Sequence, residues 1–115
     1  MTRRRLAAAL LAVAAVILSG CSQVAAIAPV GGSRLAEVRY AALDVLTSAD
    51  VEILTAPICT QGADETVTCG GTTVDGQAIR AVSTGASPDD VTVTVGSDTL
   101  YDGSVQDVLE KAMQR

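Results

Sequence analysis

Residues 91–95 read VTVTV, an unbroken alternation of β-branched side chains. Successive side chains of a strand point to opposite faces of a sheet, so this alternation predicts a half-buried strand with its valines inward and its threonines outward. Two earlier strands are expected over 51–55 and 66–73, and 78–83 is expected to be the return strand of a hairpin. The sequence therefore predicts an antiparallel sheet.

Turn residues separate these segments. Pro57 lacks a backbone N–H and limits the first strand to an edge or to an end. The Asp75-Gly76 pair predicts a two-residue type I′ turn, because that turn needs positive φ, which Gly adopts freely and Asp tolerates. A further short turn is expected at 96–98. The stretch 99–103 is then expected to lead into the last helix.

Two helices flank the expected strands. Ser33 is a suitable N-cap for a helix over 34–47, whose apolar residues recur at helical spacing. Ser104 and Asp107 stand three positions apart before a second apolar set, so a capping-box-like start is expected for a helix over 104–114. We therefore predict an α+β fold: an N-terminal helix, an antiparallel meander of three to four strands and a C-terminal helix, with the helices on one apolar face of the sheet.

The start of the chain has the charge order of an export signal. Three arginines at 3–5 precede thirteen residues without a polar side chain at 6–18, and small residues follow. The segment 21–32 is small, uncharged and interrupted by Pro and Gly, so we interpret it as a flexible tether. The predicted organisation is a signal peptide over 1–20, the tether over 21–32 and one domain over 33–115.

The stretch Leu18-Ser19-Gly20-Cys21 resembles the lipobox of bacterial lipoproteins. The resemblance implies that Cys21 receives a diacylglycerol thioether, that 1–20 is cleaved, and that the protein is lipid-anchored on the extracytoplasmic face of the cell membrane. The alternative is a transmembrane helix over 6–18 with a buried Cys21 thiol. Thirteen residues in a helix span about 20 Å, short of the roughly 30 Å hydrocarbon core. The arginines suit general secretion or a twin-arginine route, and the route stays open.

Cysteine counting predicts a disulfide. If Cys21 carries lipid, Cys59 and Cys69 are the two cysteines left for an intramolecular bond. Small domains outside the cytoplasm often carry such a bond, and closing this loop stabilises by roughly 2.5–3 kcal/mol in the chain-entropy model. The sequence has neither Phe nor Trp. The core must therefore be built from Val, Leu, Ile and Ala.

Charge and composition narrow the function. After removal of 1–20 the chain keeps five basic and thirteen acidic residues, a formal net charge of −8, which argues against nucleic acid and against electrostatic binding to anionic lipids. The sequence has no His, so the usual general base near neutral pH is missing. We expect no enzymatic activity and no cofactor.

Metal binding is not expected either. Asp98, Asp102 and Asp107 do not follow the spacing of a calcium loop. Cys59 and Cys69 supply two zinc ligands, with no His to complete a site.

Two acidic pairs, Asp64-Glu65 and Asp89-Asp90, lie in expected loops. Loops carry recognition more often than the scaffold does, so these four residues are the candidate recognition residues. A catalytic carboxylate pair is the weaker alternative, and ordinary solvated acids are the simplest explanation. If the pairs do recognise a partner, that partner is expected to be basic.

The segment 34–84 resembles small cell-envelope lipoproteins of actinobacteria that carry a domain of unknown function. Three motifs carry the resemblance. They are a first cysteine, Cys59; a second cysteine ten positions later that follows a threonine, Thr68-Cys69; and a turn between strands at Asp75-Gly76. In those domains proline often follows the first cysteine, whereas here Pro57 precedes it. The resemblance implies a fold and a disulfide but no activity.

Two functions are compatible with these features. The first is a non-catalytic binding or accessory module of the cell envelope that is anchored by lipid and contacts a protein partner. The second is a carrier or sensor of a small apolar ligand between the sheet and the helices. A cavity lined by the two helices and by the inward residues of 91–95 would favour the second, and a filled core would favour the first.

Overall fold

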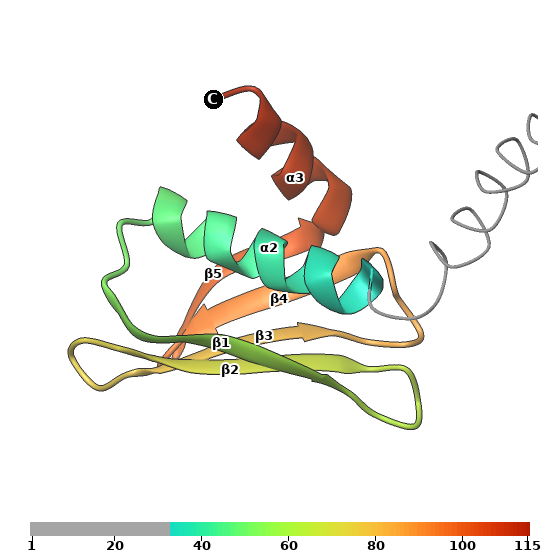
Figure 1. Cartoon of the computed structure of the whole chain (residues 1–115), viewed down its shortest axis with the longest axis horizontal. Coiled ribbons are helices and arrows are strands. Elements are labelled where there is room, and N and C mark those ends of the chain that lie inside the picture. Colours follow the sequence, from blue (N-terminus) through green and yellow to red (C-terminus); the bar gives the residue numbers. More distant parts are fainter. Residues whose placement is uncertain (1–32) are drawn as a thin grey trace, which may run out of the picture. The chain divides into compact units, whose positions relative to one another are not determined.

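The computed structural model describes residues 33–115 (Figure 1). The signal peptide, the tether and the lipid-bearing Cys21 predicted from the sequence lie outside these residues. The described elements are α2 (Ser33–Ser48), β1 (Ile53–Gln61), β2 (Val67–Thr73), β3 (Ala78–Ser83), β4 (Asp90–Val95), β5 (Asp98–Ser104) and α3 (Val105–Met113). The five strands form one antiparallel sheet in chain order, and both helices lie on the same side of it. The fold is α+β, as predicted, but the meander has five strands and not three to four.

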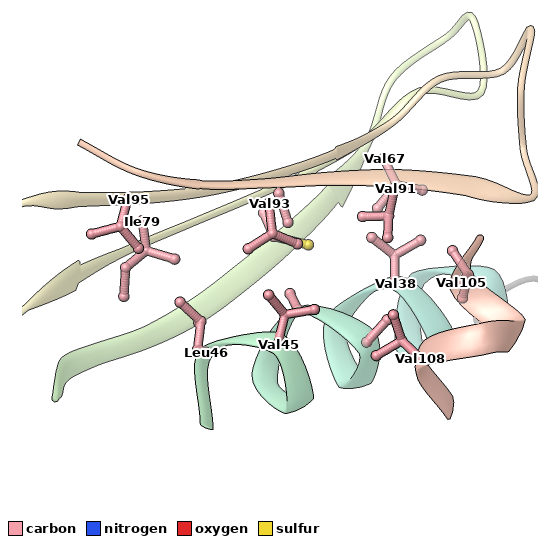
Figure 2. Close-up of a cluster of buried hydrophobic side chains, with 14 residues drawn as sticks. Val38, Val45, Leu46, Val67, Ile79, Val91, Val93, Val95, Val105 and Val108 are labelled. Atoms are coloured by element: carbon pink, nitrogen blue, oxygen red, sulfur yellow. The ribbon is translucent and has the colours of Figure 1, made fainter. Parts of the chain in front are cut away.

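The core lies between the sheet and the helices. The three valines of 91–95 are buried and the two threonines between them are partly exposed, which confirms the predicted alternation. Each such buried aliphatic side chain contributes about 1.5–3 kcal/mol. Figure 2 shows side chains of α2 directed at those of the sheet, namely Val38, Val45 and Leu46 facing Val67, Ile79, Val91, Val93 and Val95.

β1 runs through Pro57 and does not end before it. The prediction of a strand over 51–55 is therefore wrong in its bounds, although β1 is an edge strand, one of the two positions that Pro57 allowed. The pairing with β2 shifts register between Thr55 and Ile58, so Pro57 lies in a bulge. A Cβ on Gly71 of β2 would overlap the carbonyl oxygen of Thr55. Gly71 thus lets the bulged backbone approach the neighbouring strand.

The turn between β2 and β3 differs from the predicted type I′ turn. Thr73 N donates to Gln77 O at 2.9 Å, so three residues form the loop. Gly76 has a φ of 83° and its N–H donates to Thr73 O at 3.0 Å, but Asp75 lacks the positive φ that a type I′ turn requires. The hairpin is of the three-residue kind, in which a glycine in the left-handed region follows a tight turn.

β5 is the strand that the sequence pattern did not predict. Val93 pairs with Tyr101 and Thr94 with Thr99, so Leu100 is an extra residue at a bulge and interrupts the alternation of side chains. A two-residue turn joins β5 to β4, and its first residue, Gly96, has a φ of 58°. The stretch predicted to be a connection is therefore an edge strand.

α3 begins as predicted. Ser104 is its N-cap, and its side chain accepts a hydrogen bond from the backbone N of Asp107 at 3.4 Å. Tyr101 in β5 donates its hydroxyl to the carbonyl oxygen of Ser104 at 2.8 Å. This bond ties the end of β5 to the start of the helix.

Within residues 33–115, neither helix combines the length and the apolar character needed to cross a membrane.

Candidate functional site

The predicted disulfide is present. Cys59 of β1 and Cys69 of β2 are directly opposite each other in the sheet register, with their Cα atoms 4.0 Å apart and an S–S bond of 1.99 Å. Cys69 is fully buried in the core. The bond links β1 and β2 close to the loop that joins them. It therefore holds together the two strand ends that flank the loop with Asp64 and Glu65.

The loops at 62–66 and 84–89 lie at the same end of the sheet, where α2 begins (Figure 1). They are in direct contact, because a Cβ on Gly85 would overlap the carbonyl oxygen of Asp64. We call this region the loop end. The structure therefore brings together two loops that the sequence presented as independent.

Arg34, in the first turn of α2, joins both loops to the helix. Its guanidinium donates to the backbone carbonyl oxygen of Glu65 in the first loop. It also donates to the carbonyl oxygen of Ser83 at 3.2 Å, to the Ser83 hydroxyl at 3.2 Å and to the carbonyl oxygen of Thr84 at 3.0 Å. Hydrogen bonds from a charged donor are among the stronger ones in proteins, but exposure to water reduces the net contribution of this set. Arg34 thus acts as a clamp at the loop end.

Asp64 shapes its own loop. Its carboxylate accepts from the backbone N of Thr66 at 3.2 Å and from the Thr66 hydroxyl at 3.0 Å. These bonds, the backbone one first, lower the pKa of Asp64 from its usual value. Glu65 follows with a positive φ of 65°. Asp64 is therefore a structural residue of the loop as well as an exposed acid.

Asp89 and Asp90 lie in the second loop and at the start of β4. The backbone carbonyl of Asp89 accepts from Val105 N at 2.8 Å, and Asp90 pairs with Ser104 across the sheet. Both side chains are exposed. We group the four exposed acids of the loop end, Asp64, Glu65, Asp89 and Asp90, under the name acidic loop surface.

A cavity of about 260 Å³ lies elsewhere, among the last turn of α2, the middle of β5 and α3. We call it the α2–α3 pocket. Its wall is mainly apolar, and two basic side chains complete it. The lining residues are Val45, Ser48, Ala49, Leu100, Tyr101, Val108, Lys111 and Arg115.

Basic side chains and the Tyr101 hydroxyl lie on different sides of this pocket. Arg115 donates to the hydroxyl of Ser48, which joins the chain after α3 to the end of α2. The Tyr101 hydroxyl is held by Ser104 O, and its pKa is raised above its usual value by burial first and then by three neighbouring carboxylates, those of Asp107, Asp90 and Asp102. The pocket therefore has a cationic side near the helix ends, and acids lie near the Tyr101 hydroxyl.

The position of this pocket differs from the cavity that the sequence suggested. The inward valines of 91–95 do not line it, because they pack against α2 in the core. It opens instead beside β5, a strand that the sequence pattern does not predict. Its lining includes Tyr101, Lys111 and Arg115, none of which the sequence indicates as a site residue; the two basic residues are expected there only as favourable charges at the end of the last helix. Lys111 and Arg115 are four positions apart near the end of α3, which could have indicated a shared basic site. The same placement is explained equally well by a favourable interaction of cations with the C-terminal end of the helix dipole.

The outer face of the sheet carries a larger and more open hollow of about 580 Å³ over β2 and β3. Near it on β1, Leu54 and Ile58 are 68% and 69% exposed. Across the part of the chain that the structure describes, no group of three His, Cys, Asp or Glu side chains is placed to hold a metal ion. Comparison with known proteins gives no match among family models, curated proteins or solved structures.

Proposed function

We propose that this protein is a lipid-anchored lipoprotein on the extracytoplasmic face of the cell membrane, of the kind found in the actinobacterial cell envelope. The observation that carries the proposal is the order of basic residues, apolar run and Leu18-Ser19-Gly20-Cys21 at the start of the chain. In this proposal 1–20 is removed, Cys21 is acylated, and 21–32 tethers the domain.

The disulfide supports an extracytoplasmic location. Structural disulfides form and persist in oxidising compartments and are rare in the reducing cytoplasm. Cys59 and Cys69 are bonded in the core, and Cys21 is the remaining cysteine. The bond and the lipid anchor together account for all three cysteines of the chain.

The folded domain, in this proposal, is a non-catalytic binding or accessory module. The acidic loop surface is the recognition face, because Asp64, Glu65 and Asp89 lie on two touching loops held by Arg34 and the disulfide, and Asp90 begins the strand that follows. A loop that is fixed in the free protein loses little conformational freedom on binding. The expected partner is a basic protein segment of the cell envelope and not a nucleic acid, since the domain itself is strongly acidic.

Intact mass spectrometry of the membrane fraction tests the anchor. The expected mass is that of residues 21–115 with a diacylglycerol and one disulfide. Cys21→Ala is expected to leave the protein unprocessed or to release it from the membrane, and Cys59→Ala serves as the control that keeps the lipobox. A full-length mass without lipid, retained at the membrane in both variants, would contradict the proposal.

A second test addresses the acidic loop surface. Replacing Glu65, Asp89 and Asp90 by their amides removes three charges and spares the Asp64 bonds that shape the loop. The expected result is weaker, less salt-dependent crosslinking to a basic partner, with Asp44→Asn and Glu110→Gln as controls elsewhere on the domain. Unchanged crosslinking at every ionic strength would mean that these acids are solvated surface only.

The α2–α3 pocket favours a second candidate function, the binding of a small apolar ligand. At about 260 Å³ it approaches the lower end of the size range of small-molecule sites, and its wall is mostly apolar. A carrier or sensor role would place that ligand between the two helices and β5.

A further inference from the structure

We propose that the α2–α3 pocket binds a short aliphatic carboxylate, with the hydrocarbon chain against Val45, Leu100 and Val108 and the carboxylate on Lys111 and Arg115. This inference rests on the second candidate function and names the chemistry of its ligand. It does not depend on lipidation of Cys21, because every residue it uses lies in the folded domain.

The volume of the pocket sets the size of the ligand. A water molecule occupies about 30 Å³ in the liquid, so 260 Å³ accommodates on the order of eight or nine non-hydrogen atoms. A six-carbon acid, hexanoate, has about eight such atoms.

The apolar wall sets the character of the chain. Val45 of α2 and Val108 of α3 keep 8% and 6% of their surface exposed, whereas neighbouring Leu46 is fully buried. Leu100 is an extra residue at the bulge of β5 and is half-buried beside them. An aliphatic chain in the pocket would remove the remaining apolar surface of these side chains from water, at about 25 cal/mol per Å².

Charge determines the sign of the headgroup. Residues 33–115 contain five basic and thirteen acidic side chains, yet two of the five basic residues, Lys111 and Arg115, line this pocket. Within that same described domain, none of the residues lining the pocket is acidic. Arg115 donates to a neutral hydroxyl, that of Ser48, so this contact leaves its charge available to an anion.

The acids around the Tyr101 hydroxyl determine the orientation of the ligand. Asp90, Asp102 and Asp107 lie close enough to raise the pKa of Tyr101, so a carboxylate at that side of the pocket would meet like charges. The headgroup is favoured at the opposite side, at Lys111 and Arg115. The tail then points toward the Tyr101 ring.

Lys111 also has a structural explanation, because a cation in the last turn of α3 interacts favourably with the helix dipole. That role acts on the stability of the helix and is independent of a ligand. The test must therefore vary the charge of the ligand as well as the charge of the protein.

The experiment is a titration of the full protein with hexanoate, followed by methyl NMR. We expect saturating shifts at Val45, Leu100 and Val108, and none at the exposed methyls of Leu54 and Ile58 on the outer face. Hexylamine, with a positive charge, should bind at least five-fold more weakly than hexanoate. The neutral probe is 1-hexanol, which reports on the apolar wall alone.

Two variants complete the design. Lys111→Gln with Arg115→Gln should weaken hexanoate at least five-fold and leave 1-hexanol unchanged. Arg39→Gln with Arg80→Gln removes the same charge away from the pocket and should change neither. Ala49→Leu, at an exposed lining position, should weaken hexanoate and 1-hexanol alike by filling the pocket.

The outcomes separate the two claims. Binding of 1-hexanol and hexanoate with no loss in the double glutamine variant would overturn the carboxylate inference and keep the apolar-ligand function. Shifts of equal size at Leu54 and Ile58, or no shifts with any of the three probes, would overturn both. A failed lipidation test leaves this result unaffected.

Discussion

The loop end and the α2–α3 pocket are built from opposite kinds of contact. At the loop end, Arg34 donates hydrogen bonds to two segments of the chain, at Glu65 and at Ser83-Thr84, and Gly85 lets the two loop backbones touch. At the pocket, two helices and a bulged strand approach one another without filling the space between them. The difference shows where this small domain is held by polar contacts and where it leaves a pocket.

The largest expected effect is loss of the disulfide next to the loop end. The double variant Cys59→Ala with Cys69→Ala should lower the free energy of unfolding by about 3 kcal/mol, since the bond limits the unfolded chain. Urea unfolding of both forms measures the difference. Alkylation of the native protein without reduction should label neither Cys59 nor Cys69. Ready labelling of both residues would contradict the bond.

Removing the Arg34 clamp is expected to have the next largest effect. Arg34→Met keeps much of the aliphatic length and loses the bonds to three carbonyl groups and one hydroxyl, so the free energy of unfolding should fall by about 2 kcal/mol. Arg80→Met is the matched control, because Arg80 is an exposed arginine of β3. Equal losses in the two variants would show that Arg34 is not a clamp.

The contact between the two loops can be tested with glycines. Gly85→Ala should cost about 1–2 kcal/mol, because the new Cβ would overlap Asp64 O and separate the loops. Gly70→Ala is the control, since a Cβ there meets no atom within 4 Å. Thermal unfolding compares the two variants. A loss at Gly70 as large as that at Gly85 would point to backbone effects and not to the loop contact.

The smallest expected effect is on the wall of the pocket. Tyr101→Phe removes the bond to Ser104 O and should cost about 1 kcal/mol. Burial raises the pKa of Tyr101 above its usual value of 10.0, so the folded state favours the neutral phenol. The contribution of this group to the stability of the parent protein should therefore be fully present and independent of pH below pH 10, and it should be lost as the pH rises above 10. The phenylalanine variant should not show this loss of stability at alkaline pH. If the two proteins lose stability equally as the pH rises above 10, the role assigned to Tyr101 is contradicted.

Local sequence patterns predicted the elements whose side chains follow one period. The alternation in 91–95 and the helical spacing after Ser33 depend on residues close in sequence, and the structure has β4 and α2 at these positions. β1 continues beyond Pro57 because Gly71, in another strand, makes room for its bulge. The local pattern does not predict β5, because the extra residue Leu100 breaks the alternation of side chains. Both differences depend on pairing partners that local patterns do not encode.

In the candidate sites, too, features set by nearby residues could be predicted and features set by tertiary contacts could not. Cys59 and Cys69 could be paired by counting, but the contact between the 62–66 and 84–89 loops depends on sheet order and on Gly85. Arg34 did leave a signal, since a cation in the first turn of a helix opposes the helix dipole. Such a local conflict indicates a tertiary role. The pocket left no comparable pattern, because its lining comes from four places in the chain: the end of α2, β5, α3 and Arg115 after α3.

Hydrogen–deuterium exchange tests most directly whether one region is clamped and the other is open to a ligand. In the full protein, Arg34→Met should speed exchange at the hydrogen-bonded amides of Gly62 and Glu65 by at least tenfold and leave α3 unchanged. Hexanoate should slow exchange in α3 and leave the loop end unchanged. If the variant accelerates both regions equally, or hexanoate protects both or neither, the two regions do not behave as this structure predicts.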